Sequence, residues 1–370
     1  MSLPPAKWSA RAALQQTVVE RIERPVWNLV LSTAWASRNQ GVRERFRTEL
    51  SPSPLVPVWY QTEDGWRAPL WRYPARPGAS GEPVILSTGL GLNPRSLDLQ
   101  EDRSLVRSLH DQGFDVFVLT HRGSTDAVSP GGVQDFDFDD MVSHDVPAAI
   151  KVVRDVTGAQ RVHWVGHGLG GQLVLGHLAQ DGQQDIAGAV SLCAPVVFSP
   201  LHATARRVAA VAHWLPAHWH VPIRQIQEIL TVASRPTDLV HLTQRIEGPI
   251  ARSLLLDGME NLPIGLIKQV AKWHEVGSMV NRNNRFDYTA AVAGRSIRLL
   301  SIAAPDDPFC APEQAHVATE QLAGDFGESW TLDKGWGHLD PIAGADAARV
   351  VHPRISEWLH QHRTRCWTAS

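Results

Sequence analysis

The stretch that decides the fold is RVHWVGHGLGGQLVLGH, residues 161–177. Its first five residues are mostly apolar and predict a β-strand, the next six predict a tight glycine turn, and the remainder predicts a helix. Glycines two residues before and two residues after the centre of the turn allow the strand and the helix to pack closely. The residue at the centre of the turn is Gly168, which has no side chain.

The segments on either side of this stretch alternate between short apolar runs and helical patterns. The apolar runs predict strands at residues 83–87, 114–119, 161–165, 186–197 and 297–303. Helical patterns lie between and after them, at residues 102–112, 138–157, 172 onward and 345–362. Such alternation is typical of a parallel sheet with helices on both faces. The predicted fold class is therefore α/β, with a doubly wound, mostly parallel sheet.

Two regions depart from this alternation. Residues 51–81 are rich in proline and tryptophan and predict two edge strands followed by a linking loop. Residues 198–294 are largely helical and carry clustered histidine and tryptophan, as in AHWLPAHWH, which predicts a helical lid inserted between the sixth and seventh strands. The predicted domains are an N-terminal helical extension (residues 1–50), a core (residues 51–197 and 295–370) and the lid (residues 198–294).

The composition is that of a globular protein. The chain has 370 residues, of which 43% are hydrophobic and 20% charged, and its net charge of −3 gives no electrostatic reason to expect a nucleic-acid partner. The apolar run at residues 26–36 is shorter than the ~20 residues that span a bilayer, so no integral membrane span is expected. The three cysteines form neither a paired framework nor a metal cluster, which favours a reducing, cytoplasmic location. No metal or cofactor is expected, and the sequence leaves the oligomeric state open.

Several short motifs follow one another in order along the chain. Thr88-Gly89-Leu90-Gly91 follows an apolar strand, and the glycine turn around Gly168 comes next. Asp307-Pro-Phe-Cys-Ala-Pro-Glu and Gly337-His338-Leu339-Asp340 come near the end. Together they resemble the α/β-hydrolase superfamily of lipases and esterases. In that superfamily the nucleophile elbow is G-x-S-x-G, and the catalytic residues follow one another along the chain in the order nucleophile, acid, histidine. The stretch LIKQVAKWHEVGSM also resembles lids of polyhydroxyalkanoate-synthase-type members, which themselves carry cysteine at the elbow.

The resemblance implies a role for each motif. His338 would act as the catalytic base and Asp307 would orient it, with the neighbouring Asp306 as the rival for that second role. The backbone amides of Leu90 and Leu169 would form the oxyanion hole.

Further residues near these motifs are expected to matter less. Thr88, Gly89 and His167 are expected to line the binding site. The turn His121-Arg122-Gly123 stands where the family commonly has Asp-x-Arg-Gly, and we expect it to be structural. Three histidines of the predicted lid, at positions 213, 218 and 220, have no acidic or thiol partner at ligand spacing, so no metal site is expected there.

Gly168 occupies the position at which the family carries its nucleophile, and three interpretations stay open. The protein has lost its nucleophile and is a binding or regulatory module; or His338 activates water or abstracts a substrate proton without an acyl-enzyme; or Cys193 supplies the nucleophile. A serine-to-glycine substitution introduced into a serine hydrolase would produce the same sequence.

The sequence therefore predicts a hydrolase-fold protein that acts on an apolar ester or other acyl or carbonyl substrate through Asp307 and His338. Because of Gly168, its activity is expected to be impaired or to proceed without a nucleophilic side chain. The alternative is a non-catalytic protein of the same fold that binds a hydrophobic ligand or a protein partner.

Overall fold

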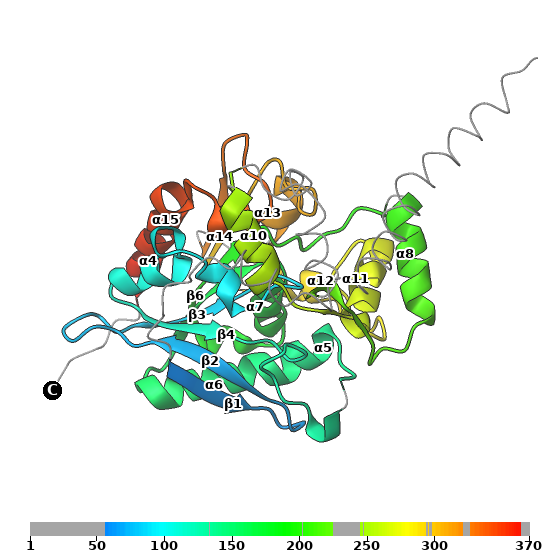
Figure 1. The fold of residues 1–370 in the computed structure, drawn as a ribbon, viewed down its shortest axis with the longest axis horizontal. Helices are drawn as coiled ribbons and strands as arrows, with labels where there is room; N and C mark the ends of the chain where they lie inside the picture. Colours follow the sequence, from blue (N-terminus) through cyan, green and yellow to red (C-terminus); the bar gives the residue numbers. More distant parts are fainter. Residues whose placement is uncertain are drawn as a thin grey trace, which may run out of the picture.

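The computed structural model describes residues 56–132, 134–201, 203–224, 245–246, 248–293, 295, 298–320 and 326–363. The predicted N-terminal helical extension, residues 1–50, lies outside the described residues, and so does part of the predicted lid, residues 225–244. Figure 1 follows the described chain in colour from the first strand to the last helix.

Eight strands form one mostly parallel sheet (Figure 1). Their order across the sheet is β1-β2-β4-β3-β5-β6-β9-β10. β1 pairs antiparallel with β2 and β2 pairs antiparallel with β4, whereas the other pairs are parallel. The strands are β1 (Val56–Gln61), β2 (Arg67–Tyr73), β3 (Pro83–Ser87), β4 (Asp115–Leu119), β5 (Val162–His167), β6 (Ile186–Leu192), β9 (Leu299–Ala303) and β10 (Gly327–Thr331). The predicted α/β fold with a mostly parallel sheet is confirmed.

The observed strands correct the sequence prediction at three places. Residues 51–81 supply two strands, but only β1 lies at the edge, because β2 is paired on both sides. The run predicted as one strand over residues 186–197 ends at Leu192, because the backbone of Cys193 turns into the left-handed region with φ 49°. β10 escapes prediction because its sequence, GESWT, has only one large apolar side chain.

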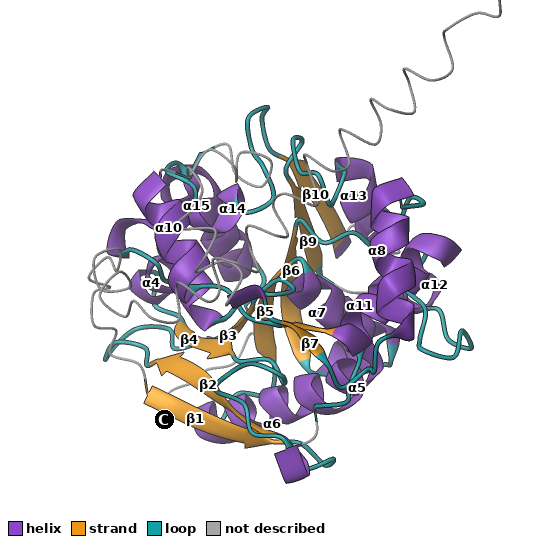
Figure 2. Ribbon diagram, turned by 45° about the vertical axis from the view of Figure 1, so that its right-hand side comes forward, coloured by secondary structure: helices purple, strands orange, loops and turns teal. Residues whose placement is uncertain are grey.

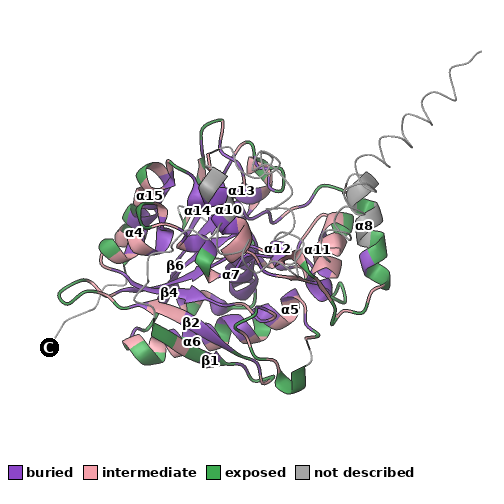
Figure 3. Cartoon of the chain, in the orientation of Figure 1, coloured by how far each residue is buried: buried purple, intermediate pink, exposed green. Residues whose placement is uncertain are grey.

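Helices cover both faces of the sheet (Figure 2). Within β4, Phe117 and Leu119 belong to one apolar core, whereas Val116 and Val118 belong to the other. This alternation follows from the two-residue period of a strand, and it gives each face its own layer of helices. The first core is completed by α6 and α7, and the second by α4, α14 and α15. Figure 3 shows that the central strands are buried while β1 is largely exposed.

The helices differ widely in length, and one of them is irregular. The long segment predicted as one helix over residues 138–157 contains a π-helical turn at Met141–Asp145 between α5 and α6. The α-helices are α4 (Leu105–Asp111), α5 (Phe138–Asp140), α6 (Val146–Thr157), α7 (Leu169–Ala179), α8 (Ala203–Trp214), α10 (Gly248–Asp257), α11 (Ile264–Val276), α12 (Tyr288–Val292), α13 (Pro312–Glu320), α14 (Asp340–Ala343) and α15 (Ala347–Gln361). Short 3-10 turns occur at Pro94–Leu97, Glu101–Arg103, Pro130–Gly132 and Gly182–Gln184.

The segment between β6 and β9 carries α8, α10, α11 and α12 together with a small antiparallel ladder of β7 (His220–Val221) and β8 (Leu262–Pro263). Its helices divide between two regions of the molecule. α8 and α11 pack on each other and α12 packs on α7, whereas α10 lies beside α14. Among the described residues, no helix is both long enough and apolar enough to cross a membrane.

The same segment is tied to the loop that follows β3. Leu92 and Met259 form an isolated antiparallel bridge, and the amide of Glu260 donates to the carbonyl oxygen of Gly91 at 2.8 Å. The amide of Asn93 donates to the carbonyl oxygen of Gly258 at 2.9 Å. These main-chain bonds fix the position of residues 258–260 against residues 91–93.

Candidate active site

The predicted strand, turn and helix around Gly168 are all present. β5 ends at His167, Gly168 has φ 49° and ψ −114°, and α7 begins at Leu169. The glycines on either side are required by packing: a Cβ on Gly166 would lie 2.2 Å from the backbone of Gly170. The amide of Gly168 donates to the carbonyl oxygen of Leu192 at 2.9 Å, which fixes the turn against β6. The turn is therefore rigid and holds its central residue at the carboxyl edge of the sheet.

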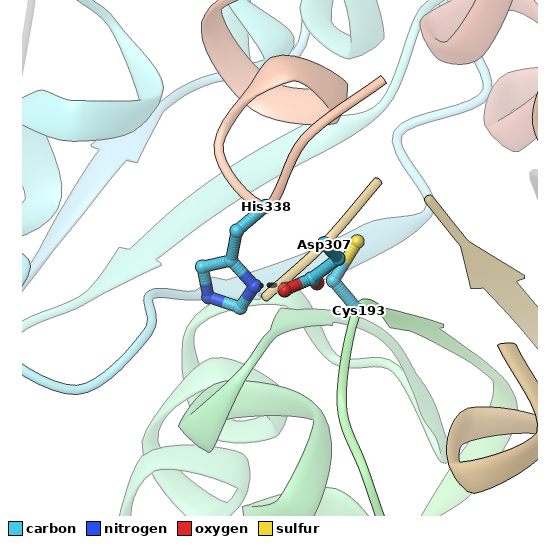
Figure 4. A group of neighbouring side chains, drawn as sticks. All are labelled: Cys193, Asp307 and His338. Carbon is cyan, nitrogen blue, oxygen red and sulfur yellow. Dashed lines mark hydrogen bonds and ion pairs between the residues drawn. The ribbon is translucent and has the colours of Figure 1, made fainter. Parts of the chain in front are cut away.

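Asp307 and His338 meet beside this turn. Asp307 lies just after β9, and its Oδ2 accepts a hydrogen bond from Nδ1 of His338 at 2.7 Å (Figure 4). Its other oxygen accepts from the amides of Phe309 at 2.7 Å and Cys310 at 3.1 Å. The Asp307 side chain is fully buried and that of His338 is 15% exposed. Three hydrogen bonds thus hold the carboxylate so that it fixes the orientation of one imidazole.

Asp306, the rival of Asp307, points elsewhere. Its Oδ2 accepts a hydrogen bond from the amide of Gly335 at 2.6 Å, and its own amide donates to the carbonyl oxygen of Trp336 at 3.0 Å. Asp306 therefore shapes the turn that leads to His338 and does not contact the imidazole.

The free edge of the His338 ring faces Gly168. A Cβ built on Gly168 would lie 3.6 Å from Nε2 of His338 and 3.5 Å from Cα of Gly89, both ordinary contact distances. A small side chain would consequently fit between the elbow and the imidazole, and its outer atom would come within hydrogen-bonding reach of Nε2.

His167 supports His338 from behind. Its Nε2 donates to the backbone carbonyl oxygen of His338 at 2.9 Å, and burial lowers the pKa of His167 to about 3, so the ring is neutral. Its Nδ1 lies where a side chain on Gly89 would have to go, 2.8 Å from the Cβ position. His167 is 1% exposed, and the centroid of its ring lies 4.5 Å from that of the His338 ring. Its position is that of a support for the histidine loop.

Thr88 and Gly89 belong to the loop after β3. The hydroxyl of Thr88 donates to the carbonyl oxygen of Leu92 at 3.0 Å, and the amide of Leu92 donates to the carbonyl oxygen of Gly89 at 3.1 Å. Both bonds stay within the loop. Thr88 therefore sets the shape of the loop that carries the amide of Leu90.

Leu90 and Leu169 line one small cavity, of about 30 Å³, at the carboxyl end of the sheet. Four further residues of this cavity, Gly123, Ser124, Glu260 and Asn261, also line a neighbouring cavity of about 750 Å³. A third cavity, of about 1350 Å³, lies between α8 and α11 and is lined by neither leucine. The space beside the two leucines is therefore narrow and lies next to a wider cavity, with which it shares part of its wall.

Cys193 lies beside Asp307, on the side of the carboxylate away from the imidazole (Figure 4). Burial, with the charge of Asp307, raises the pKa of its thiol well above the ordinary value, so the thiol is protonated and a weak nucleophile. Ligand atoms of Cys193, Asp307 and His338 lie within 4.8 Å of one another, which makes them the candidate metal-binding group of the described residues. A metal there would have to displace the thiol proton and the Asp307–His338 hydrogen bond.

Two interactions near this edge were not predicted from the sequence. Ser87 Oγ lies 2.9 Å from Nε2 of His121, which lines the same small cavity as Leu90. Arg122 is buried. Its Nε donates to both carboxylate oxygens of Asp145 at 2.8 Å, and its Nη1 donates to Oδ2 of Asp64 at 2.8 Å. The only signal in the sequence is that Ser87 and His121 each lie at the end of an apolar run. The structural role expected for the turn at residues 121–123 fits the pairing of Arg122.

Comparison with known proteins identifies the fold that carries these residues. A sequence profile of the family described as alpha/beta hydrolase fold matches residues 82–221. A soluble variant of monoglyceride lipase from Saccharomyces cerevisiae, solved with a substrate analogue, superimposes with a TM-score of 0.62 at 16% identity, covering 86% of this chain and 98% of the lipase. The chain has the α/β-hydrolase fold. A monoacylglycerol lipase from Paleococcus ferrophilus shares that fold, with a TM-score of 0.56 at 16% identity over 84% of this chain and all of the lipase (100%).

Two proteins with similar sequences match only part of the chain. A tear acid lipase-like protein of Mesocricetus auratus is 32% identical over an alignment of 174 positions that covers 42% of this chain and 41% of that protein. A poly(3-hydroxyalkanoate) polymerase subunit of Cupriavidus necator is 37% identical over 83 residues, 22% of this chain and 13% of the polymerase. The chain thus matches about two fifths of the length of the lipase and less of the polymerase.

Proposed function

We propose that this protein hydrolyses a hydrophobic ester, with His338 as the base, Asp307 as the residue that orients it, and the amides of Leu90 and Leu169 as the oxyanion hole. The observation that carries the proposal is the hydrogen bond of 2.7 Å between Asp307 and Nδ1 of His338. It leaves Nε2 directed at Gly168, where a reacting atom would have to lie. A buried carboxylate that fixes one tautomer of a histidine is the arrangement used for general base catalysis in acyl transfer.

Gly168 directs the proposal toward a mechanism without an acyl-enzyme. The space of a missing side chain, beside Nε2 of His338, can hold a water molecule as nucleophile. The water oxygen bonds to the carbonyl carbon as its proton passes to Nε2, and the amides of Leu90 and Leu169 stabilise the oxyanion. The bond to the alcohol oxygen then breaks, and His338 returns the proton to the leaving alcohol.

The segment over residues 198–294 would act as the lid of this site. Support comes from its bonds to the loop after β3, which bring Glu260 and Asn261 to the wall of the cavity beside Leu90 and Leu169. Support for an ester as substrate comes from the names of the similar proteins, which include lipases.

The test is hydrolysis of nitrophenyl esters of increasing chain length by four proteins: the unmodified protein, Gly168→Ser, Gly168→Ala and His338→Ala. We expect slow turnover by the unmodified protein that His338→Ala abolishes. Gly168→Ser supplies the hydroxyl and should raise kcat/KM by about 10²-fold or more, whereas Gly168→Ala should not.

A rate in the unmodified protein that survives His338→Ala would contradict the proposed base. If kcat/KM does not rise in Gly168→Ser although the unmodified protein turns over, the mechanism without an acyl-enzyme is supported. The expected position of a serine hydroxyl beside Nε2 of His338 is then contradicted. Absence of hydrolysis by all four proteins would contradict catalysis altogether.

The second candidate is a non-catalytic protein that binds a ligand or a partner. One observation favours it over catalysis: the cavity beside Leu90 and Leu169 is only about 30 Å³, far smaller than the ~300–1,000 Å³ of ordinary ligand pockets, whereas the cavities of about 750 and 1350 Å³ are lined by neither leucine. Titration with short-chain esters and their acids by calorimetry separates the two candidates, because a binding protein would retain the intact ester.

A further inference from the structure

His121 and Ser87 form a second histidine–hydroxyl pair near the proposed oxyanion hole. Ser87 is the last residue of β3, and His121 follows β4 by two residues. Because these strands are parallel neighbours, both residues lie at the carboxyl edge of the sheet. Ser87 is buried and His121 is half-buried, with 2.9 Å between Oγ and Nε2. This pair has no part in the mechanism proposed above.

His121 faces the narrow cavity beside the two leucines. The residues that line it include Leu90 and Leu169 together with His121, Ser124 and Glu260. Its volume, about 30 Å³, exceeds the ~10–15 Å³ that a cavity needs in order to hold one water molecule. The cavity therefore has room for a small group such as a hydroxyl, and it is lined by the two residues whose amides would hold the carbonyl oxygen.

The protonation of the pair gives the cavity a hydrogen-bond donor. Burial lowers the pKa of His121 to about 4, so its ring is neutral at neutral pH and has one N–H. Within the described part of the chain, Nε2 of His121 is the only partner of the Ser87 hydroxyl. If Nε2 carried the proton, the buried Ser87 hydroxyl would have no acceptor for its own, which is costly. Ser87 therefore donates to Nε2, and Nδ1 carries the ring proton.

We propose that His121 forms a polar subsite beside the oxyanion amides, which favours esters whose acyl group carries a hydroxyl on the carbon next to the carbonyl. Nδ1–H of His121 donates to that hydroxyl, and Ser87 is a positioning residue that fixes the tautomer. A methyl group of the same size would leave the donor unpaired, which a site built for a hydroxyl discriminates against. The proposal rests on ester hydrolysis as the function and adds the class of acyl group.

The test compares ethyl lactate with ethyl isobutyrate, which differ only by a hydroxyl in place of a methyl group. Hydrolysis by the unmodified protein and by Gly168→Ser is followed by titration of the released acid. We expect kcat/KM for the lactate to exceed that for the isobutyrate by roughly 10- to 100-fold. His121→Leu should bring this ratio close to one. His121→Asn, whose amide nitrogen takes the place of Nδ1, should retain most of it, and Ser87→Ala should lower it.

A ratio near one in the starting protein, or a ratio that His121→Leu leaves unchanged, would overturn the subsite. A second measurement separates this failure from failure of the proposed function. In His338→Ala protein labelled with 15N-histidine, ethyl lactate should shift the Nδ1 resonance of His121 and ethyl isobutyrate should not. If that shift is seen but no variant hydrolyses either ester, the subsite is supported and the hydrolase function is contradicted. If the esters are hydrolysed but the shift is absent, the hydrolase function is supported and the subsite is contradicted.

Discussion

Nε2 of His167 lies 2.9 Å from the backbone carbonyl oxygen of His338, and the centroids of the two rings are 4.5 Å apart. A carbonyl oxygen can only accept, so His167 is the donor. Because His167 directly precedes Gly168, this one bond joins the glycine turn to the loop that carries the proposed base.

We expect loss of this bond to loosen the base without affecting ester binding. His167→Leu should lower kcat for ester hydrolysis about 5- to 10-fold, which corresponds to one buried hydrogen bond, and leave KM nearly unchanged. His167→Gln, whose amide can donate to the same carbonyl oxygen, should keep most of the rate. Equal losses in the two variants would show that ring packing matters and the hydrogen bond does not.

Strain at the glycine turn should appear in stability. Gly168 has φ 49°, a conformation that residues with a side chain rarely adopt. Gly168→Ser and Gly168→Ala should therefore both lower the free energy of unfolding, by about 1–3 kcal/mol, as measured by urea denaturation. The two losses should be similar because the Cβ meets no atom closer than 3.5 Å. A much larger loss for serine would mean that the hydroxyl does not fit beside His338.

The two neighbouring aspartates should differ sharply. In Gly168→Ser protein, Asp307→Asn should lower kcat about 10³- to 10⁴-fold, because an amide no longer fixes the tautomer of His338. Asp306→Asn is the matched control: its side chain contacts Gly335 and not the imidazole, so activity should fall less than about 5-fold. Comparable losses would refute the assignment of Asp307.

The buried histidine of α15 should make stability depend on pH. Burial lowers the pKa of His352 to about 4, against ~6.5 in the unfolded chain. Between these values the unfolded chain binds more protons, so the free energy of unfolding falls as pH falls from about 6.5 to about 4. Between pH 7 and pH 5, His352 should account for a loss of about 2 kcal/mol. Urea denaturation should show that His352→Leu loses about 2 kcal/mol less free energy of unfolding between pH 7 and pH 5 than the unmodified protein. An equal loss in the two proteins would contradict the buried neutral state of His352.

The buried ion pairs of Arg122 should be structural. Arg122 bonds Asp145 and Asp64, and its guanidinium lies over the ring of Trp66, 5.2 Å from its centroid. Arg122→Leu leaves the carboxylate of Asp145 buried without a cation, which should cost about 3–5 kcal/mol of stability. Lys151→Leu, in the exposed pair with Asp155, should cost less than about 1 kcal/mol. Similar costs for the two variants would contradict this role.

The sequence predicts well what depends on local pattern. The strand, turn and helix around Gly168 follow from apolar residues and glycines within seventeen consecutive positions, and all three are present. The preference for Asp307 over Asp306 comes from spacing to Pro312, and the structure brings Asp307 to His338.

Features that depend on contacts between distant segments escape the sequence. Ser87 and His121 are 34 positions apart, and they meet because β3 and β4 are parallel neighbours, which the order of strands along the chain does not reveal. The division of the segment between β6 and β9 into two regions is likewise set by packing of α12 against α7 and of α10 against the 3-10 turn at Pro94–Leu97, which no periodicity encodes.

The bonds that join residues 91–93 to residues 258–260 have a mechanical consequence. The amide of Leu90 belongs to a loop whose far end is held by the amides of Glu260 and Asn93, while Glu260 and Asn261 also form the wall of the narrow cavity. Any displacement that widened the entrance at Glu260 would pull on the same loop and shift the Leu90 amide. We therefore expect admission of a ligand at Glu260 and alignment of the Leu90 amide to be coupled, so that a substitution that stiffens either end would slow both.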